Sequence, residues 1–234
     1  MADDQLFARL KRHASLNDND LSLISSLPRS TITTRKGRDI IKAGDMPVDV
    51  HLISSGWAAR YGIRRDGTRR ITGFMLSNDF CGIQALSGEP MVDALVAVTD
   101  CTTICFDGAA VRAVAAKSPA IAKALWRAKL VDEAILRMWL LRSSDAYLDF
   151  THLICELHAR VAANGAANEG RFNLALSQSY LADALGVTAV HVSRLNTRLR
   201  ATGMVDINKG QVTIKDVDSL RRSCYFSDAY LYLT

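Results

Sequence analysis

Residues 177–199 read SQSYLADALGVTAVHVSRLNTRL, and this stretch decides the fold of the C-terminal part of the chain. Ser177 can cap a first helix, because its hydroxyl accepts a hydrogen bond from an amide that the helix leaves unpaired. Gly186 supplies a turn, and Thr188 can cap a second helix in the same way. Two short helices joined by a glycine turn predict a helix-turn-helix, the form of many DNA-reading domains.

The second helix separates an apolar stripe from a polar face. Val192, Leu195 and Leu199 recur at spacings of three and four, so they share one face and predict its burial. A polar helix face opposite that stripe can enter the major groove of DNA. This face carries Val190, Ser193, Arg194 and Thr197.

Basic residues are unevenly distributed along the chain. The formal net charge of +5 is compatible with a polyanionic partner. Lys and Arg are absent between Arg70 and Arg112, whereas residues 188–205 contain arginines and no acid. An arginine-bearing helix without carboxylates suits phosphates, which supply affinity, and guanine edges, which supply specificity.

Length and composition favour a regulator of one or two domains. The chain has 234 residues, 49% of them apolar, which is enough for a sizeable core. It opens with MADD, without a basic flank, and no apolar run approaches the roughly 20 residues that cross a bilayer. The 5 scattered cysteines predict reduced thiols rather than a disulfide framework. We expect a cytoplasmic protein with no membrane partner.

The first 110 residues have the pattern of an antiparallel β-roll or small barrel, because short apolar or alternating runs are separated by glycine-bearing turns. The dipeptide Asp66-Gly67 predicts a hairpin with a primed turn, since both residue types tolerate positive φ. Residues 3–27 are expected to be helical. Strands are expected at residues 39–42, 50–54, 57–63, 70–75, 94–98 and 102–106.

Residues 119–144 predict a long helix, with Pro119 acceptable near its start. An apolar seam at spacings of three, four and three is typical of a coiled coil, so we expect a parallel homodimer. The alternative is one buried helix in a monomer. The predicted seam consists of Ala128, Val131, Ile135 and Met138.

A hairpin with a basic tip is predicted after the second helix of residues 177–199. Residues 204–207 and 211–214 flank Asn208-Lys209-Gly210, which is a turn sequence. Lys209 is placed to meet a phosphate, or is a solvated turn lysine. Asp216 can cap a short closing helix that runs through Arg222.

Three motifs in the β-roll region are IIKAGD at 40–45, LISSGWA at 52–58 and SNDFCG at 77–82. With the long helix and the winged helix-turn-helix, they resemble the Crp/Fnr superfamily of bacterial transcription regulators over nearly the whole chain. The resemblance implies an α+β fold: a cyclic-nucleotide-binding-like β-roll with an N-terminal helix (1–118), a dimerisation helix (119–145) and a winged helix-turn-helix domain (146–234). Residues 57–61, 130–137 and 190–194 look most like a branch frequent in alphaproteobacteria.

The resemblance also implies DNA contacts. Gln178 and Ser179 match positions that hold backbone phosphates, and Arg194 matches the arginine that contacts bases, for which a bidentate grip on guanine is natural chemistry. Val190 stands where many members have a base-reading glutamate, so the family's usual half-site is not assumed. His191 contacts phosphate or a base edge, or is a partly packed surface histidine. The predicted DNA-binding set is Gln178, Ser179, Thr188, Ala189, Val190, His191, Ser193, Arg194, Thr197, Arg198 and Lys209.

The effector site departs from the family pattern. Members that bind cyclic nucleotides have a glutamate after the position of Gly82 and, about ten residues on, an arginine for the cyclic phosphate. Here residues 90–95 offer Asp93 and no arginine, so a buried phosphate would lack a cation. We expect no cyclic AMP binding of the usual kind, unless Arg60, Arg64 or Arg69 supplies that cation. The candidate pocket consists of Phe80, Gly82, Ile83, Gln84, Asp93 and Ala94.

Other cofactors and enzymatic chemistry are not expected. No cysteine precedes Cys81, so the N-terminal cluster of the iron–sulfur branch is missing. Cys101 and Cys105 would share one face of a strand, as core thiols or as a redox pair. The 5 histidines form no metal-ligand cluster in the sequence, and no nucleophile–base pair or phosphate-binding glycine loop is found.

Two functions therefore compete. The first is a sequence-specific, DNA-binding transcription regulator that acts as a homodimer, with RNA polymerase and an unknown small-molecule effector as further partners. The alternative is a regulatory module that binds a cyclic nucleotide or another small ligand and acts on a protein partner. The acid-free second helix and the basic wing tip favour the first, while the operator and the signal are left open.

Overall fold

The computed structural model describes residues 10–141 and 145–233 of the chain. Contacts divide it into two units, one made of residues up to 62 together with 72–133, the other of residues 63–71 and 134–233. The division falls inside a long helix, α4 (Pro119–Leu140), which contributes residues to both units. Within the described ranges, no helix combines the length and the apolar character that crossing a bilayer requires.

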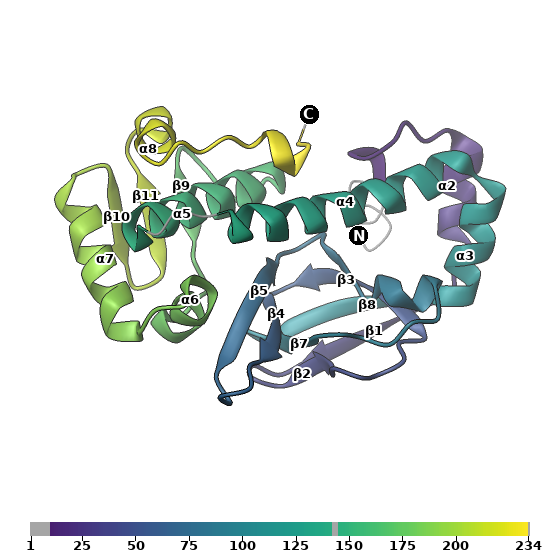
Figure 1. Cartoon of the computed structure of the whole chain (residues 1–234). Helices are drawn as coiled ribbons and strands as arrows, with labels where there is room; N and C mark the ends of the chain where they lie inside the picture. Colours follow the sequence, from purple (N-terminus) through teal and green to yellow (C-terminus); the bar gives the residue numbers. More distant parts are fainter. Residues whose placement is uncertain (1–9, 142–144, 234) are drawn as a thin grey trace. The chain divides into compact units, whose positions relative to one another are not determined.

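The first unit is built on two four-stranded sheets (Figure 1). One has the strand order β1-β8-β3-β6 with antiparallel pairing. In the other, ordered β2-β7-β4-β5, strand β7 pairs antiparallel with both β2 and β4. The predicted antiparallel β-roll is thus confirmed. The strands are β1 (Arg29–Thr34), β2 (Asp39–Ile41), β3 (Asp49–Ser55), β4 (Ala58–Ile63), β5 (Arg69–Met75), β6 (Phe80–Cys81), β7 (Ala94–Ala97) and β8 (Cys101–Asp107).

The side chains of β3 point alternately to two sides and contribute to two hydrophobic cores. Leu52 and Ile53 are adjacent and fully buried, but successive side chains of a strand point to opposite faces. Leu52 joins a cluster with Phe106 and with apolar residues of the helices, whereas Ile53 joins a cluster with residues of both sheets, such as Leu95. The helices of this unit are α2 (Asp18–Ser25), η1 (Ile83–Leu86), α3 (Gly108–Lys117) and the first part of α4.

Each of the six strands predicted in this unit is found within one residue of its expected ends, while two strands of this unit were not predicted. Strand β1 reads RSTITT and is exposed along nearly its whole length, so it lacks the apolar alternation that marks a half-buried strand. Strand β6 has 2 residues, too few for any period.

The predicted N-terminal helix is wrong as one continuous element. Its residues 3–9 lie outside the described part of the chain. After Lys11 the chain leaves the helical conformation, and α2 begins at Asp18. Asn17 caps α2 in a reciprocal box, in which the Asn17 side chain accepts from the Asp20 amide and the Asp20 carboxylate accepts from the Asn17 amide. Such a box fixes a helix start, which is why a new helix begins here.

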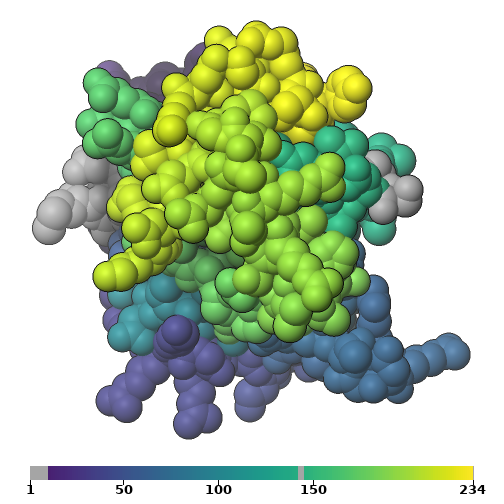
Figure 2. All heavy atoms as spheres, turned by 90° about the vertical axis from the view of Figure 1, so that its left-hand side faces the viewer, coloured from purple at the N-terminus to yellow at the C-terminus, as the bar shows by residue number. Residues whose placement is uncertain are grey.

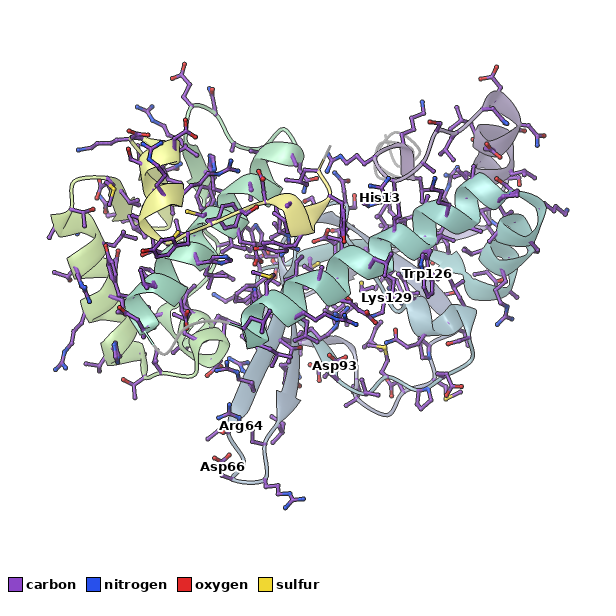
Figure 3. All side chains as sticks on the ribbon, turned by 45° about the horizontal axis from the view of Figure 1, so that its top comes forward. His13, Arg64, Asp66, Asp93, Trp126 and Lys129 are labelled. Carbon is purple, nitrogen blue, oxygen red and sulfur yellow. The ribbon has the colours of Figure 1, made fainter. Side chains whose placement is uncertain are left out.

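The β4–β5 hairpin forms as predicted, but its turn is of another type. Gly67 has φ +81°, whereas Asp66 is not in the positive-φ region. The Gly67 amide donates to the Arg64 carbonyl, and the Arg64 amide donates to the Thr68 carbonyl, both at 2.9 Å. A type I turn closed by a left-handed glycine fits this pattern, so one residue with positive φ is enough where a primed turn needs two. Arg64 and Asp66 lie at the tip of this hairpin (Figure 3).

The seam predicted on α4 needs a correction. Ala128, Val131 and Ile135 are 5%, 7% and 5% exposed, so the chain buries them itself, and Ala128 belongs to the core of the first unit. Met138, the fourth residue, is half-buried. Apolar spacing marks a buried face of a helix but does not say whether the same chain or a second copy covers it.

The exposed apolar residues of α4 lie on a different face. Trp126, Leu130 and Leu140 are 66%, 38% and 77% exposed. Their spacings place them within one stripe of the helix surface, and Trp126 projects from α4 in Figure 3. We call these three residues the α4 stripe.

The second unit is a winged helix-turn-helix with a helix on either end. Its three-stranded sheet has the order β10-β11-β9 and antiparallel pairing. The predicted closing helix is found, and Asp216 caps it. The further elements are α5 (Ala146–Ala163), β9 (Arg171–Asn173), α6 (Gln178–Leu185), α7 (Ala189–Ala201), β10 (Val205–Asn208), β11 (Gln211–Ile214), α8 (Val217–Ser223) and η2 (Ala229–Leu231).

Candidate nucleic-acid interface

Helix α6 begins and ends where the sequence predicts. Ser177 is its N-cap and accepts from the Tyr180 amide, and Gly186 follows its last residue in the left-handed conformation, with φ +72°. A side chain other than glycine would be strained at that φ, so the turn requires Gly186. Gln178 and Ser179 are exposed in the first turn of α6, where unpaired amides favour an anion such as a phosphate.

Helix α7 presents the predicted reading face to solvent. Thr188 caps the helix by accepting from the His191 amide at 3.2 Å. Val192, Leu195 and Leu199 are buried beneath it, as their spacing predicts. The opposite face is open, and the yellow-green atoms of α7 lie uncovered in the view of Figure 2. All eleven residues of the predicted DNA-binding set are exposed, from Gln178 in α6 to Lys209 in the wing.

The arginines of α7 differ in what they contact. The Arg198 guanidinium lies 4.0 Å from the centre of the Tyr147 ring, and Arg200 pairs with Asp206 at 3.1 Å. Within the described residues, the Arg194 guanidinium has neither an ion pair nor a hydrogen bond. Arg194 is therefore the arginine of α7 that can bind a new acceptor without giving up an existing contact.

The wing carries the primed turn that the β4–β5 hairpin lacks. Asn208 pairs with Gln211, so two residues form the turn, and Lys209 and Gly210 both have positive φ, +48° and +84°. This is a type I′ connection, whose twist matches that of the flanking strands. It holds the exposed Lys209 at the tip of the wing.

The acid of α6 is already neutralised. The Asp183 carboxylate pairs with Arg69, whose Nε and Nη2 atoms each lie 2.7 Å from it. The Arg69 guanidinium also lies 4.6 Å from the centre of the Tyr180 ring. Arg69 belongs to the segment 63–71, which clusters with the second unit. The pairing removes an uncompensated negative charge from the helix that precedes α7.

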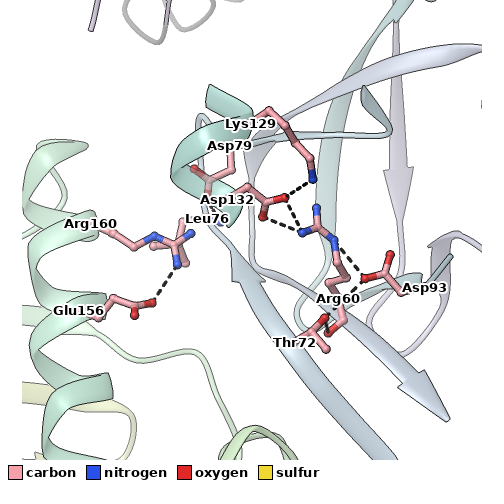
Figure 4. A network of polar contacts seen from close by, with 9 residues as sticks. All are labelled: Arg60, Thr72, Leu76, Asp79, Asp93, Lys129, Asp132, Glu156 and Arg160. Carbon is pink, nitrogen blue, oxygen red and sulfur yellow. Dashed lines mark hydrogen bonds and ion pairs between the residues drawn. The ribbon is translucent and has the colours of Figure 1, made fainter. Parts of the chain in front are cut away.

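In the first unit, the candidate effector residues meet a network of charges that the sequence analysis missed. The Nη1 atom of Arg60 lies 2.6 Å from Asp132 of α4, its Nε lies 3.5 Å from Asp93, and Lys129 binds Asp132 at 3.2 Å (Figure 4). Arg60 and Asp132 are 72 residues apart, so no local pattern relates them. We call these four residues the Arg60 network.

Burial and neighbouring cations shift the carboxylate pKa values of the Arg60 network in opposite directions. Burial raises the pKa of Asp93, and nearby Arg60 opposes that shift only in part. Burial would also raise the pKa of Asp132, but Arg60 and Lys129 outweigh it and lower that pKa. The Arg60 guanidinium is thus bound to two carboxylates of the chain itself. A cyclic phosphate would have to compete with both for it.

The other candidate residues of the first unit lie around η1 or on the strands. Gly82 has φ +68° and precedes η1, which contains Ile83 and Gln84. Cys101 and Cys105 lie on β8 as predicted, and burial raises the pKa of Cys101 to about 11. The Cys105 Sγ lies 3.3 Å from the buried Nδ1 of His51. Among the described residues, no group of three or more metal-ligating side chains is found.

A winged helix-turn-helix with an exposed basic reading face, together with a roll of two antiparallel sheets, defines a class of DNA-binding regulators. A family model described as a Crp-like helix-turn-helix domain matches residues 150–223, and one described as a cyclic nucleotide-binding domain matches residues 31–118. The chain belongs to the Crp/Fnr family of transcription regulators. This membership favours the regulator over a module that acts on a protein partner.

Curated relatives and solved structures agree with this assignment. The fumarate and nitrate reduction regulatory protein of Salmonella typhimurium is 26% identical over 212 residues, which cover 88% of this chain and 83% of the relative. The anaerobic regulatory protein of Haemophilus influenzae is 25% identical over 215 residues, 88% of this chain and 80% of the relative. The structure of FixK2 from Bradyrhizobium japonicum shares the fold, with a TM-score of 0.74 at 21% identity, over 84% of this chain and 97% of that one.

Proposed function

We propose that this regulator binds a specific DNA operator as a homodimer, with Arg194 reading a base and Gln178, Ser179 and Lys209 holding phosphates. The unpaired guanidinium of Arg194 on the open face of α7 carries the proposal. Bidentate binding of guanine O6 and N7 needs a guanidinium without competing partners. The family resemblance implies RNA polymerase as a further partner, and a regulator that acts on bacterial DNA works in the cytoplasm, which is the location we propose.

Selection of duplexes from a random pool tests this function. A two-fold protein should enrich a repeat whose half-sites are about 10–10.5 base pairs apart, or a multiple of that spacing. Each half-site should contain a guanine that Arg194 contacts. Recovery of duplexes with no shared sequence, or of none, would contradict sequence-specific binding.

The α4 stripe is the surface that supports a homodimer. Its residues, Trp126, Leu130 and Leu140, are large apolar side chains left in solvent along one helix face. Such a stripe is stabilised when a second copy covers it, and two recognition helices then contact two half-sites.

The double variant Trp126→Glu/Leu130→Glu should be monomeric. Four glutamates would meet across a two-fold seam, and their repulsion is relieved by dissociation. Sedimentation at micromolar concentration measures the effect, and circular dichroism checks that the fold is retained. The matched control is Val190→Glu, another exposed apolar residue, at 64%, outside the stripe. A double variant that remains dimeric would show that the seam lies elsewhere.

The sensor unit does not bind cyclic AMP in the family's usual way. The Arg60 network supports this proposal, because the Arg60 guanidinium is already paired with the carboxylates of Asp93 and Asp132. Cyclic AMP and cyclic GMP at physiological concentrations should leave the melting temperature unchanged. A ligand at one hundred times its Kd stabilises the native state by about 2.7 kcal/mol, so binding would be visible. A dose-dependent rise in melting temperature would refute this proposal.

A further inference from the structure

Two buried thiols of the second unit lie in contact with each other. Cys155 is on α5, Cys224 is the residue that ends α8, and their Sγ atoms are 3.8 Å apart. They are 3% and 6% exposed and 69 residues apart in the sequence. Neither residue belongs to the predicted DNA-binding set.

We propose that Cys155 and Cys224 are a site of reversible oxidation, at which a hydroperoxide converts the two thiols into a disulfide. The S–S bond length is about 2.05 Å, so the sulfurs must approach by about 1.8 Å. Cys224 lies at the C-cap of α8, so a small backbone shift there acts on the cap hydrogen bonds of its amide with Arg221 and Arg222 and leaves the preceding turn of the helix in place. This inference is independent of the proposed operator binding.

The two sulfurs are suited to different steps of the oxidation. The two sulfurs share a hydrogen bond in which either thiol can be the donor, and this contact lowers the pKa of Cys224 and raises that of Cys155. Cys224 therefore has more thiolate character and is the first nucleophile. It is followed by Tyr225, which is 87% exposed, so the chain reaches solvent directly beside it.

The chemistry balances with one hydroperoxide molecule. The Cys224 thiolate attacks one oxygen of hydrogen peroxide, the O–O bond breaks, the other oxygen leaves as hydroxide and takes up a proton to become water, and Cys224 becomes a sulfenic acid. The Cys155 sulfur, after losing its proton, attacks the sulfenic sulfur, the S–O bond breaks, and the oxygen leaves as water. In total, two thiols give up two electrons and two protons to hydrogen peroxide, which becomes two molecules of water.

The bond would close a loop that contains the whole helix-turn-helix and wing. Elements β9, α6, α7, β10, β11 and α8 all lie between the two cysteines. A cross-link restricts the unfolded chain more strongly when the loop is long. The oxidised form should therefore resist unfolding better than the dithiol form, which is the expected resting state in a reducing compartment.

Thiol counting and peptide mapping on the full chain test the proposal. After treatment with hydrogen peroxide and alkylation, we expect two of the 5 thiols to be protected, in one cross-linked peptide pair that holds Cys155 and Cys224. Dithiothreitol should restore both thiols. Another pairing, a sulfinic acid without a bond, or an unchanged thiol count would overturn the proposal.

Cysteine variants and melting temperatures distinguish a Cys155–Cys224 disulfide from oxidation elsewhere in the chain. Cys155→Ser and Cys224→Ser should each abolish the cross-link, whereas Cys81→Ser, which changes a buried thiol of the first unit, should leave it intact. In the wild type, oxidation should raise the melting temperature by about 5–10 °C, and in Cys224→Ser it should not. A fall in the wild-type melting temperature would contradict a stabilising cross-link, and the wild-type mapping stands even if a variant fails to fold.

Discussion

Replacing Arg194 by alanine is expected to weaken operator binding by about 1–3 kcal/mol at each half-site. For a dimer this is about 2–6 kcal/mol, a loss of at least about 30-fold in affinity. Arg194 is exposed on α7 and has no partner among the described residues, so the variant should lose base contact without losing a contact inside the protein. The preference for one base pair should relax, as measured by fluorescence anisotropy on duplexes that differ at that pair.

Two control variants distinguish base reading from general affinity. Lys209→Ala removes a cation at the wing tip. It should weaken binding to operator and random duplex alike, and the slope of log affinity against log salt concentration should become shallower by roughly one unit per site. Arg200→Ala removes an arginine of the same helix that is already paired with Asp206, so operator affinity should change little. If Arg194→Ala weakened all duplexes equally, Arg194 would be a phosphate contact, and base reading would have to come from Val190, His191 or DNA shape.

The helix-turn-helix could be predicted from the sequence because its signals are local. Ser177 and Thr188 each accept from an amide three residues along the chain, Gly186 adopts its left-handed conformation by itself, and all three occupy the cap or turn positions that were expected. The wing was predictable for the same reason, since Lys209 and Gly210 form its turn by themselves. Strand β1 was missed because its apolar content is low and its place is fixed by pairing with β8, about 70 residues away.

The effector region could be predicted only in part, because its charges come from distant segments. The absence of an arginine near Asp93 is visible in the sequence, but the Arg60 network also needs Asp132 and Lys129 from α4. The prediction of a dimer seam on α4 was wrong for a related reason. Periodicity shows which residues share a face, and only the three-dimensional structure shows that the chain itself covers Ala128, Val131 and Ile135.

A second distant network was invisible in the sequence, and it stabilises the DNA-binding unit. Glu156 on α5 is fully buried. Its Oε2 atom accepts from the Trp139 indole and from the Tyr230 hydroxyl, each at 2.9 Å, and its Oε1 atom accepts from Arg160 at 3.4 Å. One carboxylate thus connects the last turn of α4, helix α5 and the C-terminal segment. A buried carboxylate is tolerated only with such partners.

Glu156→Ala is therefore expected to destabilise the second unit by about 3–5 kcal/mol, because it removes the buried carboxylate that pairs with Arg160 and accepts from Trp139 and Tyr230. Urea unfolding followed by circular dichroism measures the loss. Glu156→Gln keeps the shape and one acceptor, so its cost should be smaller. Tyr230→Phe should cost about 1 kcal/mol, the net value of one hydrogen bond, whereas Tyr225→Phe, at an 87% exposed side chain, should cost close to nothing. If Glu156→Ala were no more destabilising than Tyr225→Phe, the carboxylate would not be the centre of this network, and the C-terminal segment would be held by ring contacts such as that of Phe226 with His152.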